Sequence, residues 1–137
     1  MPLLKGVASK STPNKAIGYI TRKDKAAYVS VQNLFADEDY AEQFKETAAR
    51  YGKGKLRDER KYYHFKLSPN RKDKADPFMV QEYAKSYAEK AFPDCECVIA
   101  THTDTKTVHA HIIVNAVHPF TGRKLRFTES GYTKLKD

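Results

Sequence analysis

Hydrophobic and polar positions alternate most clearly between Val108 and Asn115, a segment that reads VHAHIIVN. A period of two is typical of a β-strand, whose successive side chains project to opposite faces of a sheet. His109, His111 and Ile113 are therefore expected to share one face with Asn115. Two histidines on one strand face, separated by a single residue, are the first candidate for a chemical site.

A third histidine is brought to the same place by the segment that precedes this strand. Residues 103–108 are expected to form the loop of a hairpin, so that His102 lies opposite His109 and Ala100 lies opposite His111. Directly opposed residues in an antiparallel pair share a face, so three imidazoles converge above a small alanine. A loop one residue shorter would turn His102 to the other face.

The rest of the chain mixes strand and helix patterns. Extended segments are expected over 2–9, 27–31, 62–67 and 123–127, and helices over 13–22, 39–52 and 77–92. The last helix is expected to bury a stripe formed by Met79, Tyr83, Tyr87 and Ala91. Because helices and strands are mixed and the histidines lie on a hairpin, we expect an α+β fold. It comprises a central, mostly antiparallel sheet of about five strands, with helices packed on one face.

Three neutral imidazole nitrogens suit a borderline divalent metal ion and leave coordination positions open. Asp104, in the connecting loop, could orient one ring through its other nitrogen, or it could simply form an Asx-turn. A single strand histidine is more often a core or rim residue satisfied by hydrogen bonds. His64 is interpreted in this way, as a structural or DNA-facing histidine, because no partner at ligand spacing accompanies it.

Composition agrees with a globular protein that binds a polyanion. The 137 residues are expected to form one domain over 1–137, with 40% hydrophobic and 31% charged residues. A net charge of +8 favours a polyanionic partner, and nine tyrosines and seven phenylalanines offer flat surfaces for unpaired bases. No apolar run approaches the ~18 residues of a membrane span, which makes cytoplasmic residence the default expectation. Cys95 and Cys97 are expected to be reduced and partly buried.

Three segments of the chain follow one another in a characteristic order. Residues 15–20 read KAIGYI, residues 62–68 read YYHFKLS, and residues 102–115 contain HTD, HAH and IIVN. Together with TGRK at 121–124, this order resembles the conjugative relaxases, mobilisation nucleases of the VirD2-like (MOBP) group within the His-hydrophobic-His endonuclease superfamily. The third segment is the specific one. The chain departs from the family at Val108, where relaxases often have proline before the histidine pair.

The resemblance implies a bacterial DNA endonuclease that nicks one strand at a transfer origin for conjugative transfer or mobilisation. Tyr19 would be the nucleophile that forms a 5′-phosphotyrosyl intermediate, and His102, His109 and His111 would bind a divalent ion. Mg or Mn is expected, with Zn or Ni as alternatives. Asp104 would orient His102 or support proton removal from Tyr19.

Further roles follow from the same resemblance. Asn115 would support the metal ligands by hydrogen bonds, although a strand-end polar residue is an equal interpretation. Contacts with DNA are expected from Ser68, Lys66, Arg123, Lys124 and Arg126. Single-stranded DNA at the transfer origin is the expected partner, together with accessory mobilisation and coupling proteins. The chain would be the N-terminal nuclease domain of a longer protein.

Three alternatives stay open on the sequence. Replication initiators and small transposases of the same superfamily place their tyrosine after the histidine pair, which would make Tyr132 the nucleophile. A non-catalytic module that binds single-stranded DNA explains the charge and the aromatics but not the three histidines. A cupin-like metal oxygenase is disfavoured because no acid at ligand spacing and no distant fourth histidine follow the pair. From spacing alone, Tyr19 has no better claim than Tyr28.

Overall fold

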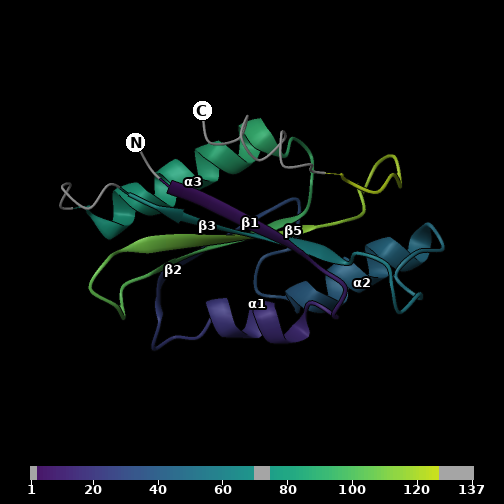
Figure 1. Ribbon diagram of the computed structural model, residues 1–137, viewed down its shortest axis with the longest axis horizontal. Coiled ribbons are helices and arrows are strands. Elements are labelled where there is room, and N and C mark those ends of the chain that lie inside the picture. The colour runs from purple at the N-terminus through teal and green to yellow at the C-terminus, as the bar shows by residue number, and fades with distance from the viewer. Residues whose placement is uncertain (1–2, 70–74, 127–137) are drawn as a thin grey trace.

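A five-stranded antiparallel sheet forms the centre of the molecule (Figure 1). The computed structural model describes residues 3–69 and 75–126. Along the chain, the elements are β1 (Leu3–Ser9), α1 (Asn14–Ile20), β2 (Ala26–Gln32), α2 (Tyr40–Arg50), β3 (Tyr62–Ser68), α3 (Pro77–Ala91), β4 (Cys97–His102) and β5 (His109–Asn115). The strands lie in the order β1-β3-β5-β4-β2, and every neighbouring pair is antiparallel. The expected α+β class and the expected sheet are confirmed.

Helices cover both faces of this sheet, which corrects the expectation of helices on one face only. Figure 1 shows α3 on one side and α1 with α2 on the other. Every residue of β4 and β5 is buried, so the side chains that alternate between their two faces are all removed from water. Apolar side chains on both faces need cover on both faces, because burial of apolar surface drives packing.

The two sides of the sheet have separate cores. On the α3 side, Phe65, Ile99 and Ile112 pack with Ala84 and Phe92. On the α1 and α2 side, smaller strand residues meet helix side chains; this second cluster comprises Ile17, Ile20, Ala41, Phe44, Tyr62, Val98, Ala100 and Ile113. The second cluster matters for function, because it holds α1 against the strand face that carries the histidines.

The helix α3 is rotated relative to the stripe expected from its sequence. Met79 is 62% exposed and Tyr83 is 49% exposed, whereas Ala84 and Ala88 are completely buried. Small side chains let the helix approach the sheet closely, so alanines take the inner face and two larger residues remain at the surface. The predicted beginning of the helix is confirmed, since the Asp76 carboxylate accepts a hydrogen bond from the amide of Phe78.

Several smaller expectations are also settled by the structure. The extended segment expected over 27–31 is β2, and both cysteines are free and buried. The expected strand over 123–127 is reduced to an isolated bridge between Val117 and Lys124 within the described residues. No helix in the parts of the chain that the structure describes is long and apolar enough to cross a membrane.

Candidate metal and nucleophile site

The three histidines of the hairpin meet on one face of the sheet, in the register expected from the sequence. His102 lies opposite His109, and Ala100 lies opposite His111. One potential ligand atom from each ring lies within 4.8 Å of the other two. Ala100 leaves space beside the rings because its side chain is a single methyl group. The predicted juxtaposition of the three histidines is confirmed.

Hydrogen bonds fix which nitrogen of each ring remains free. The Nε2 of His102 lies 2.8 Å from the carbonyl oxygen of Ile20, and the Nδ1 of His109 lies 3.0 Å from that of Thr107. A carbonyl can only accept, so these nitrogens carry protons and the opposite nitrogens keep a lone pair. His102 therefore offers Nδ1 to a ligand, and His109 offers Nε2.

The third ring is oriented by another histidine, which the sequence did not indicate. The Nδ1 of His111 lies 2.8 Å from the Nε2 of His64, and the ring centroids are 4.9 Å apart. If His111 donates this hydrogen bond, its Nε2 is free on the side of His102 and His109. This tautomer is consistent with the compact cluster, in which His102 and His111 have ring centroids 4.5 Å apart.

Burial lowers the pKa of two of the three rings, His109 and His111. Burial is the main cause that lowers the pKa of His111 to about 3, and the neighbouring His64 is the second cause. Burial also lowers the pKa of His109 and of His64. A protonated imidazole cannot bind a metal ion, so lowered pKa values keep the ligand nitrogens available at neutral pH. Three neutral nitrogens with defined tautomers fit a borderline divalent ion.

Tyr19 stands next to this cluster. It lies at the end of α1, where buried Ile17 and Ile20 attach the helix to the sheet and leave the phenol 48% exposed on the flank. Its ring lies edge-on to His102, with 5.9 Å between centroids. Tyr28 points elsewhere, against Phe78 of α3, with 5.8 Å between ring centroids. The structure thus distinguishes Tyr19, which lies beside the histidines, from Tyr28, which does not. Spacing in the sequence could not make this distinction.

Among the described residues, the hydrogen-bond partner of Asp104 is a lysine and not a histidine ring, which corrects its predicted role in orienting His102. Its carboxylate pairs with the Lys25 ammonium at 2.9 Å, and the ring nitrogen of His102 is bound by the Ile20 carbonyl instead. This hydrogen bond raises the pKa of Lys25 and lowers that of Asp104. The Lys25 ammonium lies 5.1 Å from the centroid of the Tyr19 ring. Asp104 therefore holds a cation beside the phenol rather than orienting a ligand.

Comparison with known proteins identifies the family. A family model described as the nuclease domain of MobA/VirD2-like relaxases matches residues 19–137, which is most of the chain. The chain belongs to the MobA/VirD2-like relaxases. It is 29% identical to a protein rlx of Staphylococcus aureus over 121 residues, which cover 86% of this chain and 34% of that protein. A second S. aureus protein rlx is 34% identical over 92 residues, covering 66% of this chain and 28% of that protein. The relaxase chain thus spans about a third of the length of these curated relatives.

Two solved structures share the fold. The MobM relaxase domain, crystallised with Mn and bound to oriT DNA of plasmid pMV158, has a TM-score of 0.68 at 14% identity, over 98% of this chain and 81% of that one. A structure described as the molecular basis of vancomycin resistance transfer in S. aureus has a TM-score of 0.70 at 10% identity, over 98% and 86% of the two chains. These likenesses establish a common fold, and the expected relationship to VirD2-like relaxases is confirmed by the family match.

Asn115 lies at the opposite end of β5 from His109 in this relaxase, which corrects its predicted role beside the ligands. Its amide nitrogen donates to the Phe44 carbonyl at 3.1 Å and to the Glu96 carboxylate at 2.8 Å. Its amide oxygen accepts from the amide of Val117. Burial raises the pKa of Glu96, which also accepts a hydrogen bond from a threonine of α2. Asn115 is a buried structural residue that connects β5 to α2.

The basic residues expected to contact DNA fall into two groups. Lys66 is exposed and lies opposite His111 on β3, and Ser68 ends the same strand. The others lie beyond the far end of β5, where Lys124 pairs with Glu59 at 2.8 Å and neighbours exposed Arg123 and Arg126. Only the first group borders the histidines. Tyr132, the alternative nucleophile, lies outside the described residues.

Proposed function

We propose that this relaxase domain nicks one DNA strand at a transfer origin by attack of Tyr19 on a phosphodiester. The observation that carries the proposal is the position of Tyr19, an exposed phenol whose ring centroid lies 5.9 Å from that of His102 in the cluster of three histidines. Nucleophilic catalysis needs such an accessible group beside the groups that stabilise charge.

The reaction exchanges one phosphate ester for another. The Tyr19 oxygen forms a bond to phosphorus, and the bond from phosphorus to the 3′-oxygen breaks. The phenol loses one proton and the departing 3′-oxygen gains one, leaving a 5′-phosphotyrosyl ester and a free 3′-hydroxyl. Because the new ester is similar in energy to the old one, attack by a 3′-hydroxyl can rejoin the strand without a nucleotide cofactor.

The histidines would hold a divalent ion through Nδ1 of His102 and Nε2 of His109 and His111. Such an ion, when bound, withdraws charge from the phosphoryl oxygens as a Lewis acid. The Mn-bound state of the MobM relaxase domain supports Mn or Mg for this chain as well. The Lys25 ammonium, fixed by Asp104, would place a positive charge beside the phenol that attacks the phosphate.

The test is a covalent adduct. The chain is incubated with pooled single-stranded fragments of the genetic element that encodes it, with Mn²⁺ or Mg²⁺, and the products are separated on denaturing gels. We expect a metal-dependent adduct that mass spectrometry places on Tyr19, and we expect Tyr19→Phe to abolish it. Tyr28→Phe is the matched control, because Tyr28 is 40% exposed but faces α3.

Two results would contradict the proposal. If the Tyr19→Phe variant still forms the adduct and Tyr132→Phe does not, the nucleophile follows the histidine pair, as in replication initiators and transposases. If the wild-type chain binds single-stranded DNA without metal and never forms an adduct, the chain is a binding module whose histidines are structural.

A further inference from the structure

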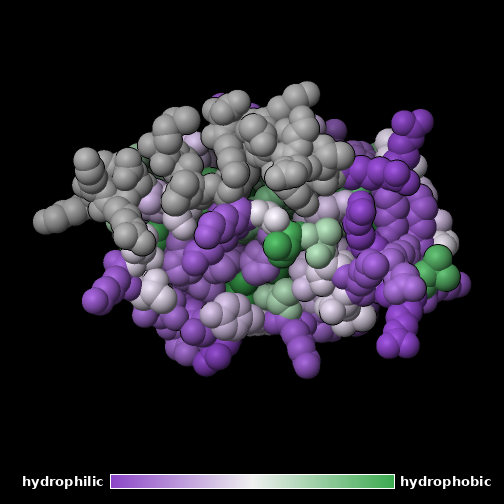
Figure 2. Space-filling model, in the orientation of Figure 1, coloured by the Kyte–Doolittle hydropathy of each residue, from purple (hydrophilic) through white to green (hydrophobic). Residues whose placement is uncertain are grey.

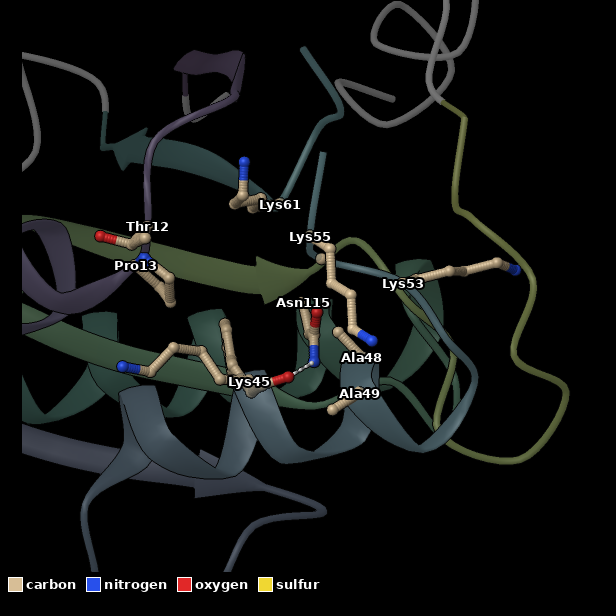
Figure 3. Close-up of a pocket in the computed structure, with 11 residues that line it drawn as sticks. Thr12, Pro13, Lys45, Ala48, Ala49, Lys53, Lys55, Lys61 and Asn115 are labelled. Atoms are coloured by element: carbon tan, nitrogen blue, oxygen red, sulfur yellow. Dashed lines mark hydrogen bonds between the residues drawn. The ribbon is translucent and has the colours of Figure 1, made fainter. Parts of the chain in front are cut away.

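A basic pocket opens on the side of the sheet that carries the histidines, at the far end of β5. Its cavity of about 160 Å³ lies between the beginning of α1, the helix α2 and the segment that follows α2. Apolar Pro13, Phe44, Ala48 and Ala49 line the pocket together with Asn115. Figure 3 shows Asn115 between Pro13 and Ala48. The pocket thus lies at the opposite end of β5 from His109.

The charged residues that line the pocket are all lysines, and one of them, Lys45, also pairs with Glu42 at 2.6 Å. Four lysines line it (Lys45, Lys53, Lys55 and Lys61), and none of the described residues lining it is acidic. Figure 3 shows Lys55 reaching toward Ala48 and Asn115, with Lys45 on the other side of the opening. Lys55 has no hydrogen-bond or ion-pair partner in the described part of the chain. Its charge is therefore available to an anion.

The lysines at the pocket differ in their surroundings from the charged residues on the other side of α2. The ammonium groups of Lys53 and Lys61 are held by backbone carbonyls rather than by carboxylates, and Figure 3 shows both directed away from Asn115. The other side of α2 is different, because a second cavity there is lined by Glu38, Glu46 and Glu96. Figure 2 shows hydrophilic side chains gathered at the right-hand end of the view, where Figure 1 places α2.

The helix α1 connects this pocket to the candidate nucleophile. Pro13, which precedes α1, lines the pocket, and Tyr19 lies at the end of the same helix. Six residues of helix span roughly 9 Å. One DNA strand advances about 3.4 Å per nucleotide, so a strand at Tyr19 reaches the pocket within about three nucleotides.

We propose that this pocket binds one unpaired nucleotide of the same DNA strand, a few positions away from the scissile phosphate. The base would lie on the apolar floor formed by Phe44 and Ala49, and its phosphate would lie between Lys45 and Lys55. This inference rests on the proposed function for the identity of the strand. It adds an anchoring site, separate from the histidines, that would set where along the strand Tyr19 acts.

The role of the lysines is tested by measuring equilibrium binding of single-stranded DNA in EDTA. EDTA removes divalent ions, so binding is measured without nicking. The probe is labelled oligothymidylate of about 20 nucleotides, longer than the ~4–16 nucleotides covered by a single-strand-binding fold. We expect Lys45→Gln and Lys55→Gln each to reduce the slope of log affinity against log salt by about 0.7, and to weaken binding about fivefold at 0.1 M salt. Lys85→Gln is the matched control for Lys45, because both are exposed helix lysines paired with a glutamate three residues earlier.

The base is tested by filling the pocket without changing its charge. We expect Ala49→Leu to weaken binding of oligothymidylate, to leave the salt slope unchanged, and to reduce the preference over an abasic strand of equal length. Ser86→Leu, at an exposed position of α3, controls for an added surface leucine. Circular dichroism checks the fold of each variant.

Each result decides the proposal. It is wrong if the Lys45 and Lys55 variants behave like Lys85→Gln, if Ala49→Leu behaves like Ser86→Leu, or if the wild-type chain does not bind the oligonucleotide. The proposed function would fail separately if the pocket variants weaken DNA binding as expected but the wild-type chain never forms a tyrosine adduct.

Discussion

His64 offers a direct test of how the metal site is assembled. Its Nε2 lies 2.8 Å from the Nδ1 of His111. If His111 binds a metal ion through Nε2, its Nδ1 carries the proton, and His64 can accept a hydrogen bond from it. His64→Leu removes the acceptor, whereas His64→Gln keeps an acceptor oxygen on a flexible side chain. We expect the leucine variant to bind Mn²⁺ more weakly and the glutamine variant to recover most of the affinity.

The size of the effect follows from the contact. Without the acceptor, the proton of His111 moves to Nε2 in part of the molecules, and that nitrogen is the one the ion needs. Loss of a partner that orients a metal-binding histidine typically costs 10–100-fold in affinity, or about 1.4–2.7 kcal/mol. The net contribution of one hydrogen bond, about 0.5–1.5 kcal/mol, reaches only the lower limit of that range, so we expect a loss of about tenfold.

Two measurements separate orientation from general damage. Isothermal titration of the metal-free chain with Mn²⁺ gives the affinity, and ¹⁵N NMR of the imidazoles gives the tautomer of His111 without any metal. His118→Leu is the control, since His118 is a turn residue whose Nδ1 accepts from the amides of Phe120 and Thr121. The reasoning fails if His64→Leu binds Mn²⁺ like the wild type, or if the glutamine variant is as weak as the leucine variant while His111 keeps its tautomer.

Three other predictions concern the neighbouring groups. Asn115→Ala should lower the free energy of unfolding in urea by about 1–3 kcal/mol, because buried partners lose their hydrogen bonds, and should leave Mn²⁺ affinity unchanged. Asp104→Asn should change Mn²⁺ affinity by less than about threefold in isothermal titration, since its partner is Lys25; a loss of tenfold or more would restore its predicted role beside His102. The metal-free chain should lose stability in urea as the pH falls from about 6.5 toward 3: burial lowers the pKa of His111 to about 3, so the unfolded chain takes up protons in this window that the folded chain excludes. Equal stability in EDTA at pH 7 and pH 5 would show that the histidines titrate normally.

Local patterns were sufficient to predict the histidine hairpin. The six residues between His102 and His109 set the register, and alternation then placed His111 on the same face. Because both strands are adjacent in the sequence, no long-range pairing had to be known. The exposure of Tyr19 also follows from local sequence, because Ile17 and Ile20 occupy the buried side of its short helix.

Long-range pairing explains what sequence reasoning missed. The strand β3 lies next to β5, although α3 and β4 separate them along the chain, and this pairing places Lys66 opposite His111 and His64 opposite Ile113. Alternation had already put His64 and Lys66 on one face of their strand. Only the strand order showed that this face is the one that carries the metal candidates.

Side-chain size explains the error in α3. Met79 and Tyr83 have helical spacing and apolar character, so they fitted an inner stripe as well as Ala84 and Ala88 did. The sheet beneath α3 already presents large residues such as Phe65 and Ile112, and packing at interior density then favours small helix residues opposite them. A pattern of hydrophobicity alone does not contain that complementarity.

The end of α1 connects the histidine cluster to the candidate nucleophile. The last carbonyls of a helix have no partner within the helix, and the carbonyl oxygen of Ile20 accepts a hydrogen bond from the Nε2–H of His102. The adjacent residue, Tyr19, is the candidate nucleophile. The backbone segment that orients a candidate metal ligand is therefore the segment that carries the phenol, and the fully buried Ile20 side chain fixes both to the sheet. The distance from nucleophile to ligand is thus set by adjacent residues of one helical turn rather than by the docking of a separate loop.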